Sequence, residues 1–227
     1  MKRKRKTGNI VHIKRNNKKN YIIYAGVVLL LVLMVFFTIS NLFINKRGKP
    51  SVDVDSSCPE IAVELLDINE YSRPGIEVDH ISGIVIHYTA NPGSTAMNNR
   101  DYFNSLQDGH GGYVSSHFVV GLEGEIVQCI PTWELAYASN ERNDDTISIE
   151  CCHPDETGEF TDETYRSIVQ LTAYLCAKYN LDEDVVIRHY DVTGKICPKY
   201  FVENEDAWEQ FKIDVAAALE KGSEEAE

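Results

Sequence analysis

Apolar and polar residues alternate along the C-terminal three quarters of this chain in a pattern that predicts strands and helices in turn. The run "GIVIHYT" (83–89) is β-branched and apolar on both faces, which is typical of a central strand buried on both sides. Shorter runs, "TISIECC" (146–152) and "DVVIRHY" (184–190), predict two further strands. Between them, "SHFVVGLEGEIVQCI" (116–130) predicts two strands joined by a glycine-containing turn.

Three segments have helical spacing of apolar residues. Residues 161–180 are the clearest, because Thr161 can cap the first turn and apolar side chains recur on one side. Residues 94–107 predict a second helix with Ser94 as its cap, and residues 205–221 predict a last helix with an aromatic buried face. The order of these elements predicts an α/β domain in which a central mixed β-sheet is flanked by helices.

The N-terminal quarter has a different pattern. Residues 21–44 contain no charged side chain in 24 positions, and a helix needs about 20 apolar residues to cross a bilayer. Nine Lys and Arg precede this run and three follow it, which predicts one transmembrane helix with a cytoplasmic N-terminus and an extracellular C-terminal domain. The alternative is a cleaved signal peptide. Its apolar region would be about 7–15 residues followed by a small-residue cleavage site, and "NLFINKRGKP" (41–50) offers none.

Charge divides the chain in the same place. The formal net charge of the 227 residues is -13, yet the first 50 residues hold 12 Lys and Arg and no Asp or Glu. The rest therefore holds 22 − 12 = 10 basic residues against 35 acidic ones. This acidic portion argues against nucleic acid as a partner, since nucleic-acid binding requires a basic surface.

These observations divide the chain into five parts. We expect a basic cytoplasmic flank at 1–20, the membrane helix at 21–44, a polar linker at 45–57, the globular domain at 58–221 and an acidic tail at 222–227.

Candidate metal ligands lie at the ends of two predicted strands. His87 ends the first strand and His189 ends a later one, and ligands of α/β sheets gather outside the carboxyl ends of strands. Cys197 lies on the loop that follows His189. Two histidines and a thiolate with a fourth position left open make a catalytic zinc pattern. Spacing alone also allows two core histidines and a buried, inert cysteine.

Two further residues are candidates for the chemistry. Glu150 lies in an apolar strand, where a carboxylate must be paired, lie near a metal or have a raised pKa, and each of these suits a proton-transfer group. The alternatives for Glu150 are an edge position facing water or a structural salt bridge. Lys195 precedes Cys197 by two residues and is placed to stabilise an oxyanion, although a solvated loop lysine is the ordinary alternative.

Four stretches in this order carry a family resemblance: "GIVIHYTANPGSTA", "YVSSHFVVGLEGEIVQCIP", "NDDTISIE" and "RHYDVTGKICP". Together they resemble the zinc-dependent N-acetylmuramoyl-L-alanine amidases, which share their fold with phage lysozyme-type amidases and peptidoglycan-recognition proteins. The resemblance runs from about residue 69 to residue 201. It implies zinc ligands at His87, His189 and Cys197, a catalytic acid at Glu150 and an oxyanion-stabilising lysine at Lys195.

The resemblance also bears on neighbouring positions. Some members use a tyrosine where this chain has Ser116, which leaves the glutamate as the better candidate acid. His117 matches a family histidine that is not a ligand, and we expect it to be bonded across the sheet rather than catalytic. Many members read Trp-His-Ala-Gly where this chain reads "AYAS", so Tyr137 replaces the histidine and Ser139 the glycine. We expect Tyr137 and Asn143, with His117, to contact either the substrate or a metal ligand.

The implied activity is hydrolysis of the amide between the lactyl group of N-acetylmuramic acid and L-alanine of the stem peptide, with Zn²⁺ as cofactor. The implied partner is peptidoglycan, and we expect a monomer. The domain is acidic, as cell-wall polymers are, so the anchor rather than charge would hold it at the wall of a bacterium. Two alternatives are a peptidoglycan-binding module that does not cut, and a zinc enzyme that cuts within the peptide. The presence of Cys197, Glu150 and Lys195 favours the enzyme over the binding module.

Overall fold

The computed structural model describes residues 24, 26–35 and 48–225. The chain divides into two units, residues 1–47 and 48–227. In the first unit, residues 26–35 are helical and their large apolar side chains are exposed. Among the residues described, none of the helices combines the length and apolar character needed to cross a membrane. The other positions of the predicted membrane helix, and the whole basic flank, lie outside the described residues.

The second unit is built on a six-stranded mixed sheet with the order β1-β4-β3-β5-β2-β6. The strands are β1 (Ala62–Val63), β2 (Gly83–Tyr88), β3 (Phe118–Val120), β4 (Ile126–Gln128), β5 (Thr146–Cys151) and β6 (Val186–Arg188). The central strand β2 runs parallel to both β5 and β6, β5 runs parallel to β3, and β3 pairs with β4 in the antiparallel sense. The predicted α/β class with a central mixed sheet is therefore confirmed.

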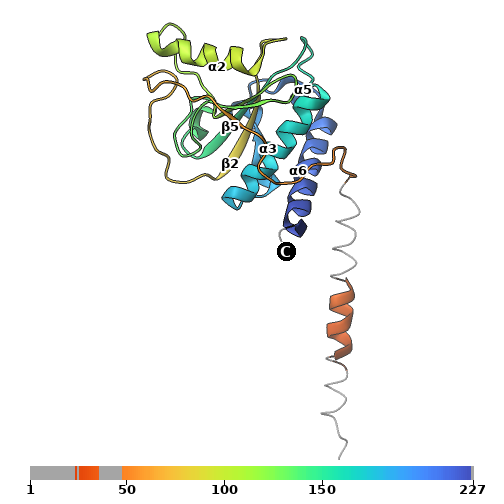
Figure 1. The fold of residues 1–227 in the computed structure, drawn as a ribbon. Helices are drawn as coiled ribbons and strands as arrows, with labels where there is room; N and C mark the ends of the chain where they lie inside the picture. Colours follow the sequence, from red (N-terminus) through yellow and green to blue (C-terminus); the bar gives the residue numbers. More distant parts are fainter. Residues whose placement is uncertain (1–23, 25, 36–47, 226–227) are drawn as a thin grey trace, which may run out of the picture. The chain divides into compact units, whose positions relative to one another are not determined.

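Five α-helices of the second unit are described: α2 (Ala96–Ser105), α3 (Asp162–Tyr179), α4 (His189–Thr193), α5 (Lys199–Glu203) and α6 (Glu205–Glu225). Three short 3₁₀ helices join them, at Leu106–Asp108, Asn140–Arg142 and Glu183–Val185. Figure 1 shows the long helices α3 and α6 side by side against the sheet, with α2 apart from them.

The two faces of the sheet carry different side chains. Ile84 and Ile86 of β2 and Ile149 of β5 belong to the core that includes the buried residues of α3 and α6. Side chains alternate between faces along a strand, so His87 and Glu150 lie on the opposite face. A smaller apolar cluster, which includes residues of α2, β3 and β4, covers part of that second face. The polar residues of β2 and β5 thus lie at the carboxyl ends of central strands, away from the α3/α6 core.

The predicted helix caps are correct for α3 and wrong for α2. The Thr161 hydroxyl accepts a hydrogen bond from the backbone N–H of Thr164 at 3.0 Å, as expected of the cap of α3. Helix α2 is capped by Thr95 rather than Ser94, because Thr95 and Asn98 form a reciprocal capping box. The Ser94 hydroxyl instead donates to the carbonyl of Asn91 at 2.7 Å.

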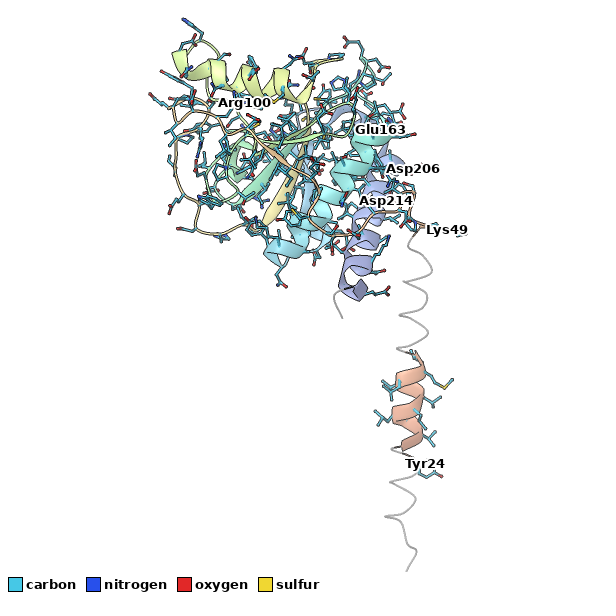
Figure 2. The ribbon with its side chains drawn as sticks, in the orientation of Figure 1. Tyr24, Lys49, Arg100, Glu163, Asp206 and Asp214 are labelled. Atoms are coloured by element: carbon cyan, nitrogen blue, oxygen red, sulfur yellow. The ribbon has the colours of Figure 1, made fainter. Side chains whose placement is uncertain are left out.

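Part of the stretch predicted as a linker contacts the domain. The backbone N–H of Ser51 donates to Asp214 Oδ1 on α6 at 2.6 Å, and the hydroxyl of Tyr165 on α3 donates to Asp214 Oδ2 at 2.6 Å. Gln210, one turn before Asp214, donates to the carbonyl of Lys49 at 3.0 Å. Figure 2 labels Lys49 and Asp214 on this side of α6. Asp214 is fully buried, and the bonds from Ser51 and Tyr165 together satisfy its carboxylate.

Candidate metal centre and active site

The two histidines and the cysteine of the predicted metal site come together. One ligand atom from each of His87, His189 and Cys197 lies within 4.8 Å of the other two, and all three side chains are buried. His87 Nδ1 is 3.8 Å from Cys197 Sγ, and the two imidazole rings have centroids 4.6 Å apart.

The sheet explains why residues more than 100 positions apart meet. Ile86 of β2 pairs with Arg188 of β6 in a parallel ladder, so the next residue of each strand, His87 and His189, emerges at the same sheet edge. The strand β6 ends two residues before the end of the predicted strand (184–190), and His189 is the first residue of α4. The backbone N–H of Tyr190 then donates to the carbonyl of Cys197 at 2.9 Å, which folds the loop back onto the histidines.

Arg188 fixes the point at which α4 begins. Its guanidinium donates to both carboxylate oxygens of Asp191, at 3.1 and 2.9 Å, and its backbone N–H donates to Asp191 Oδ2 at 2.8 Å. The same guanidinium reaches Glu205 at 2.7 Å and the carbonyl of Phe201 at 3.1 Å. A buried, multiply bonded arginine of this kind leaves little freedom to the adjacent His189.

Glu150 lies beside the three candidate ligands. It pairs in register with His87 across β5 and β2, and its Oε1 is 4.0 Å from His87 Nδ1. Its side chain is only 16% exposed, and its Oε2 is buried with no hydrogen-bond partner among the residues described. Burial raises the pKa of Glu150 to about 8, and the charge of Lys195 opposes this shift.

The donor set fits a zinc ion. Burial lowers the pKa of both His87 and His189, with contributions from Lys195, and so keeps the imidazoles in the neutral form that binds metals. Burial and the nearby Glu150 raise the pKa of the Cys197 thiol to about 12, so a thiolate there requires a compensating cation. Two imidazoles and a thiolate suit Zn²⁺, and a cation would also compensate the unpartnered oxygen of Glu150.

Lys195 is exposed on the loop between α4 and α5 and contributes to the same pocket. Its ammonium group acts on the site at a distance, lowering the pKa values of His87, His189 and Glu150. Within the part of the chain that the structure describes, no ion pair of 4.0 Å or less joins Lys195 to Glu150. The lysine is therefore available to a group that enters the pocket.

The pocket has a volume of about 350 Å³ and one aromatic wall. Tyr113, Val114, Tyr137 and Asn143 line it together with the five residues named above. The rings of Tyr113 and Tyr137 meet edge to face with centroids 5.1 Å apart, and the Tyr113 hydroxyl donates to Glu70 at 2.9 Å. Tyr137, which stands where many family members have histidine, thus belongs to a fixed wall of the pocket.

His117 and Ser116 are not among the residues that line this pocket. His117 Nδ1 accepts from the backbone N–H of Ser148 on β5 at 3.0 Å, and its Nε2 lies 2.8 Å from the carbonyl of Glu134. The Ser116 hydroxyl is 3.1 Å from the Ser148 hydroxyl. Both residues bond across the sheet, and burial lowers the pKa of His117 to about 4.

Asn143 shapes the loop beside the histidines. Its Oδ1 accepts the backbone N–H groups of Ala138 and Ser139, at 3.0 and 2.6 Å. Two contacts in this loop were not predicted from the sequence. The hydroxyl of Ser139 is 3.2 Å from His87 Nε2, and Asn140 Oδ1 is 2.9 Å from His189 Nε2. The only signal in the sequence is the serine that replaces the family glycine at position 139.

This mixed-sheet domain, with two histidines and a cysteine at one sheet edge, matches a known family. The N-acetylmuramoyl-L-alanine amidase family matches residues 77–200, more than half of the chain. The chain therefore belongs to the N-acetylmuramoyl-L-alanine amidase family, and the resemblance seen in the sequence is confirmed.

Individual relatives agree with this assignment. The N-acetylmuramoyl-L-alanine amidase CwlL of Bacillus licheniformis is 34% identical over 173 residues, which cover 70% of this chain and 48% of that protein. A probable N-acetylmuramoyl-L-alanine amidase of the same organism is 35% identical over 167 residues, covering 68% of this chain and 47% of that protein. The chain spans about half the length of these curated relatives. The structure of PlyL shares the fold, with a TM-score of 0.62 at 24% identity over 70% of this chain and 99% of that one.

Proposed function

We propose that this chain hydrolyses peptidoglycan at the amide between the lactyl group of N-acetylmuramic acid and L-alanine of the stem peptide, with Zn²⁺ held by His87, His189 and Cys197. The observation that carries the proposal is the convergence of these three ligand atoms beside a buried carboxylate in one pocket. Zn²⁺ bound there would acidify a water molecule and polarise the scissile carbonyl. Membership of the amidase family supports this choice of bond.

Glu150 is assigned the proton transfers. Its Oε2 is buried and has no partner among the described residues, so it is available to accept a proton from the attacking water. The raised pKa allows the same group to hold that proton and to pass it to the departing amine of L-alanine. The water oxygen ends in the lactyl carboxylate and the proton ends on the amine, which balances the hydrolysis.

Lys195 is assigned the stabilisation of charge. Negative charge develops on the carbonyl oxygen during attack, and a positioned cation in a partly enclosed site stabilises it more effectively than water does. The absence of an ion pair with Glu150 among the described residues leaves the ammonium group free for this role. The wall formed by Tyr113, Val114 and Tyr137 would orient the substrate.

The test is mass spectrometry of muropeptides incubated with the full chain, with and without a metal chelator. The expected products are a free stem peptide beginning at L-alanine and a glycan with a lactyl carboxylate, both lost on chelation and restored by Zn²⁺. Retention of muropeptides without cleavage would indicate a binding module. Fragments cut between amino acids would indicate a zinc peptidase.

We further propose the arrangement expected from the sequence: residues 21–44 anchor the chain in the membrane, residues 1–20 are cytoplasmic and the domain of residues 58–221 is extracellular. The support is the uncharged run of 24 residues with nine basic residues before it and three after it. Protease added to protoplasts should digest the domain and spare an epitope tag at residue 1. Digestion of the tag with protection of the domain would reverse the orientation, and recovery of the intact chain outside the membrane fraction would exclude the anchor.

A further inference from the structure

The turn of residues 138–143 contacts both candidate metal-binding histidines through their Nε2 atoms. His87 Nε2 is 3.2 Å from the hydroxyl of Ser139, and His189 Nε2 is 2.9 Å from Oδ1 of the adjacent Asn140. His87 Nδ1 in turn lies 3.8 Å from Cys197 Sγ. For His87 the contacts therefore separate the two ring nitrogens: Nε2 faces the turn and Nδ1 faces the cysteine.

The chemistry of the partners sets the tautomer. A carboxamide Oδ1 can only accept, so His189 Nε2 must carry the hydrogen and Nδ1 must present its lone pair. Ser139 is 1% exposed, and its hydroxyl can accept in the same way from His87 Nε2. Metal-binding histidines generally donate their second N–H to such a partner, which orients the ring and strengthens the ligand.

Hydrogen bonds within the turn hold it in place. The side chain of Asn143 accepts two backbone N–H groups within the turn, at 3.0 and 2.6 Å. Arg142, the last residue of the 3₁₀ helix, donates to Asp145 at 2.7 Å. Asn140 has a φ of 53°, a left-handed conformation that asparagine tolerates better than most residues.

We propose that Ser139 and Asn140 are positioning residues that select Nδ1 of His87 and of His189 as the zinc ligands and thereby set the affinity of the site for the metal. The inference rests on the proposed zinc site and adds to it which ring nitrogens bind and which residues hold them.

The test compares zinc affinities of full-length variants by competition with a chromophoric chelator. Ser139→Ala and Asn140→Gly should each weaken zinc binding by roughly 10–100-fold, the usual effect of losing a hydrogen-bond partner of a ligand. Glycine is chosen at 140 because it keeps the left-handed backbone without strain. Ser139→Thr retains a hydroxyl and should restore most of the affinity lost in Ser139→Ala.

Matched controls separate positioning from stability. Ser116→Ala also removes a buried hydroxyl, and Asn180→Gly also replaces an asparagine at a left-handed position, at the end of α3. Both should bind zinc as the wild-type chain does. Weakening in the controls equal to that in Ser139→Ala and Asn140→Gly would overturn the proposal, as would wild-type affinity in those two variants.

Nitrogen-15 spectra of histidine-labelled protein give a readout that does not depend on affinity. In the metal-free chain His87 and His189 should be protonated at Nε2, and added zinc should shift their Nδ1 resonances. Zinc ligation through Nε2 would overturn the positioning proposal while leaving the zinc site intact. A wild-type chain that binds no zinc at all would instead refute the proposed function, and with it this inference.

Discussion

Replacing Glu150 with glutamine should abolish most turnover and yet stabilise the metal-free protein at neutral pH. Glutamine preserves the size of the side chain, and Glu150 is not one of the three clustered ligands. Its Oε2 has no hydrogen-bond partner among the described residues, so the substitution breaks no bond there. Loss of a positioned general base costs about 10²–10⁴ in rate, or about 3–5 kcal/mol in the activation free energy.

The sign of the stability change follows from the pKa. Glu150 has a folded-state pKa of about 8 against 4.5 for the ordinary group, because burial disfavours the carboxylate. Between these values the unfolded chain releases a proton that the folded chain retains, so the free energy of unfolding falls as pH rises. At pH 7 the loss is about 3 kcal/mol, from about 2.5 pH units at 1.36 kcal/mol each. Glutamine does not titrate and should recover this amount.

Three measurements on the same preparations test the prediction: zinc content, release of stem peptide, and urea unfolding of chelator-treated protein at pH 5 and pH 7. The Glu150→Gln chain should hold wild-type zinc and should gain stability at pH 7 but little at pH 5. Glu209→Gln, an exposed change on α6, serves as the control for loss of one negative charge.

Two results would refute the reasoning. A folded, zinc-loaded Glu150→Gln chain that cleaves at the wild-type rate would remove Glu150 from the mechanism. A metal-free variant that is less stable than wild type at pH 7 would show that the carboxylate is charged and structurally paired, as expected if Glu150 merely balanced Lys195.

Three further changes have defined outcomes. Lys195→Ala should keep zinc and lose about 10²–10³ in turnover. The double variant Lys195→Ala/Glu150→Gln should lose less turnover than the product of the two single losses, since both groups act on one transition state. A loss in the double variant equal to that product, measured by stem-peptide release, would contradict this. Cys197→Ser should greatly weaken zinc binding. Metal analysis showing as much zinc per chain in this variant as in the wild type would remove Cys197 from the ligand set. Burial lowers the pKa of His117 to about 4, so as pH falls this histidine is protonated at a lower pH in the folded chain than in the unfolded chain. The free energy of unfolding of the metal-free wild-type chain, measured relative to that of His117→Gln by urea unfolding, should therefore fall by about 3 kcal/mol between pH 6.5 and pH 4.

The sequence was most informative where one segment supplies its own signal. The apolar runs that become β2 and β5 and the capped helix α3 are local patterns, and the structure places them within one or two residues of the prediction. Helices α4 and α5 were missed, because five residues are too few to show helical periodicity.

Contacts between segments far apart in the sequence could not be predicted from local sequence patterns. The hydrogen bonds between His87 and Ser139 and between His189 and Asn140 join residues 52 and 49 positions apart. The bond from Ser51 to Asp214 spans 163 positions. The sequence around these residues does not predict which residues they pair with, since a loop serine or asparagine has many possible partners.

Given the proposed membrane anchor, the bond between Gln210 and the Lys49 carbonyl would limit how far the domain can move from the membrane. With the anchor proposed to end at residue 44, only residues 45–48 separate the bilayer from the first point held by the domain. Four residues span at most about 14 Å when fully extended, and a domain of this size is roughly 40 Å across. No part of the domain could then lie more than about 55 Å from the membrane surface. Such an enzyme would reach only the peptidoglycan that lies within this distance of the membrane.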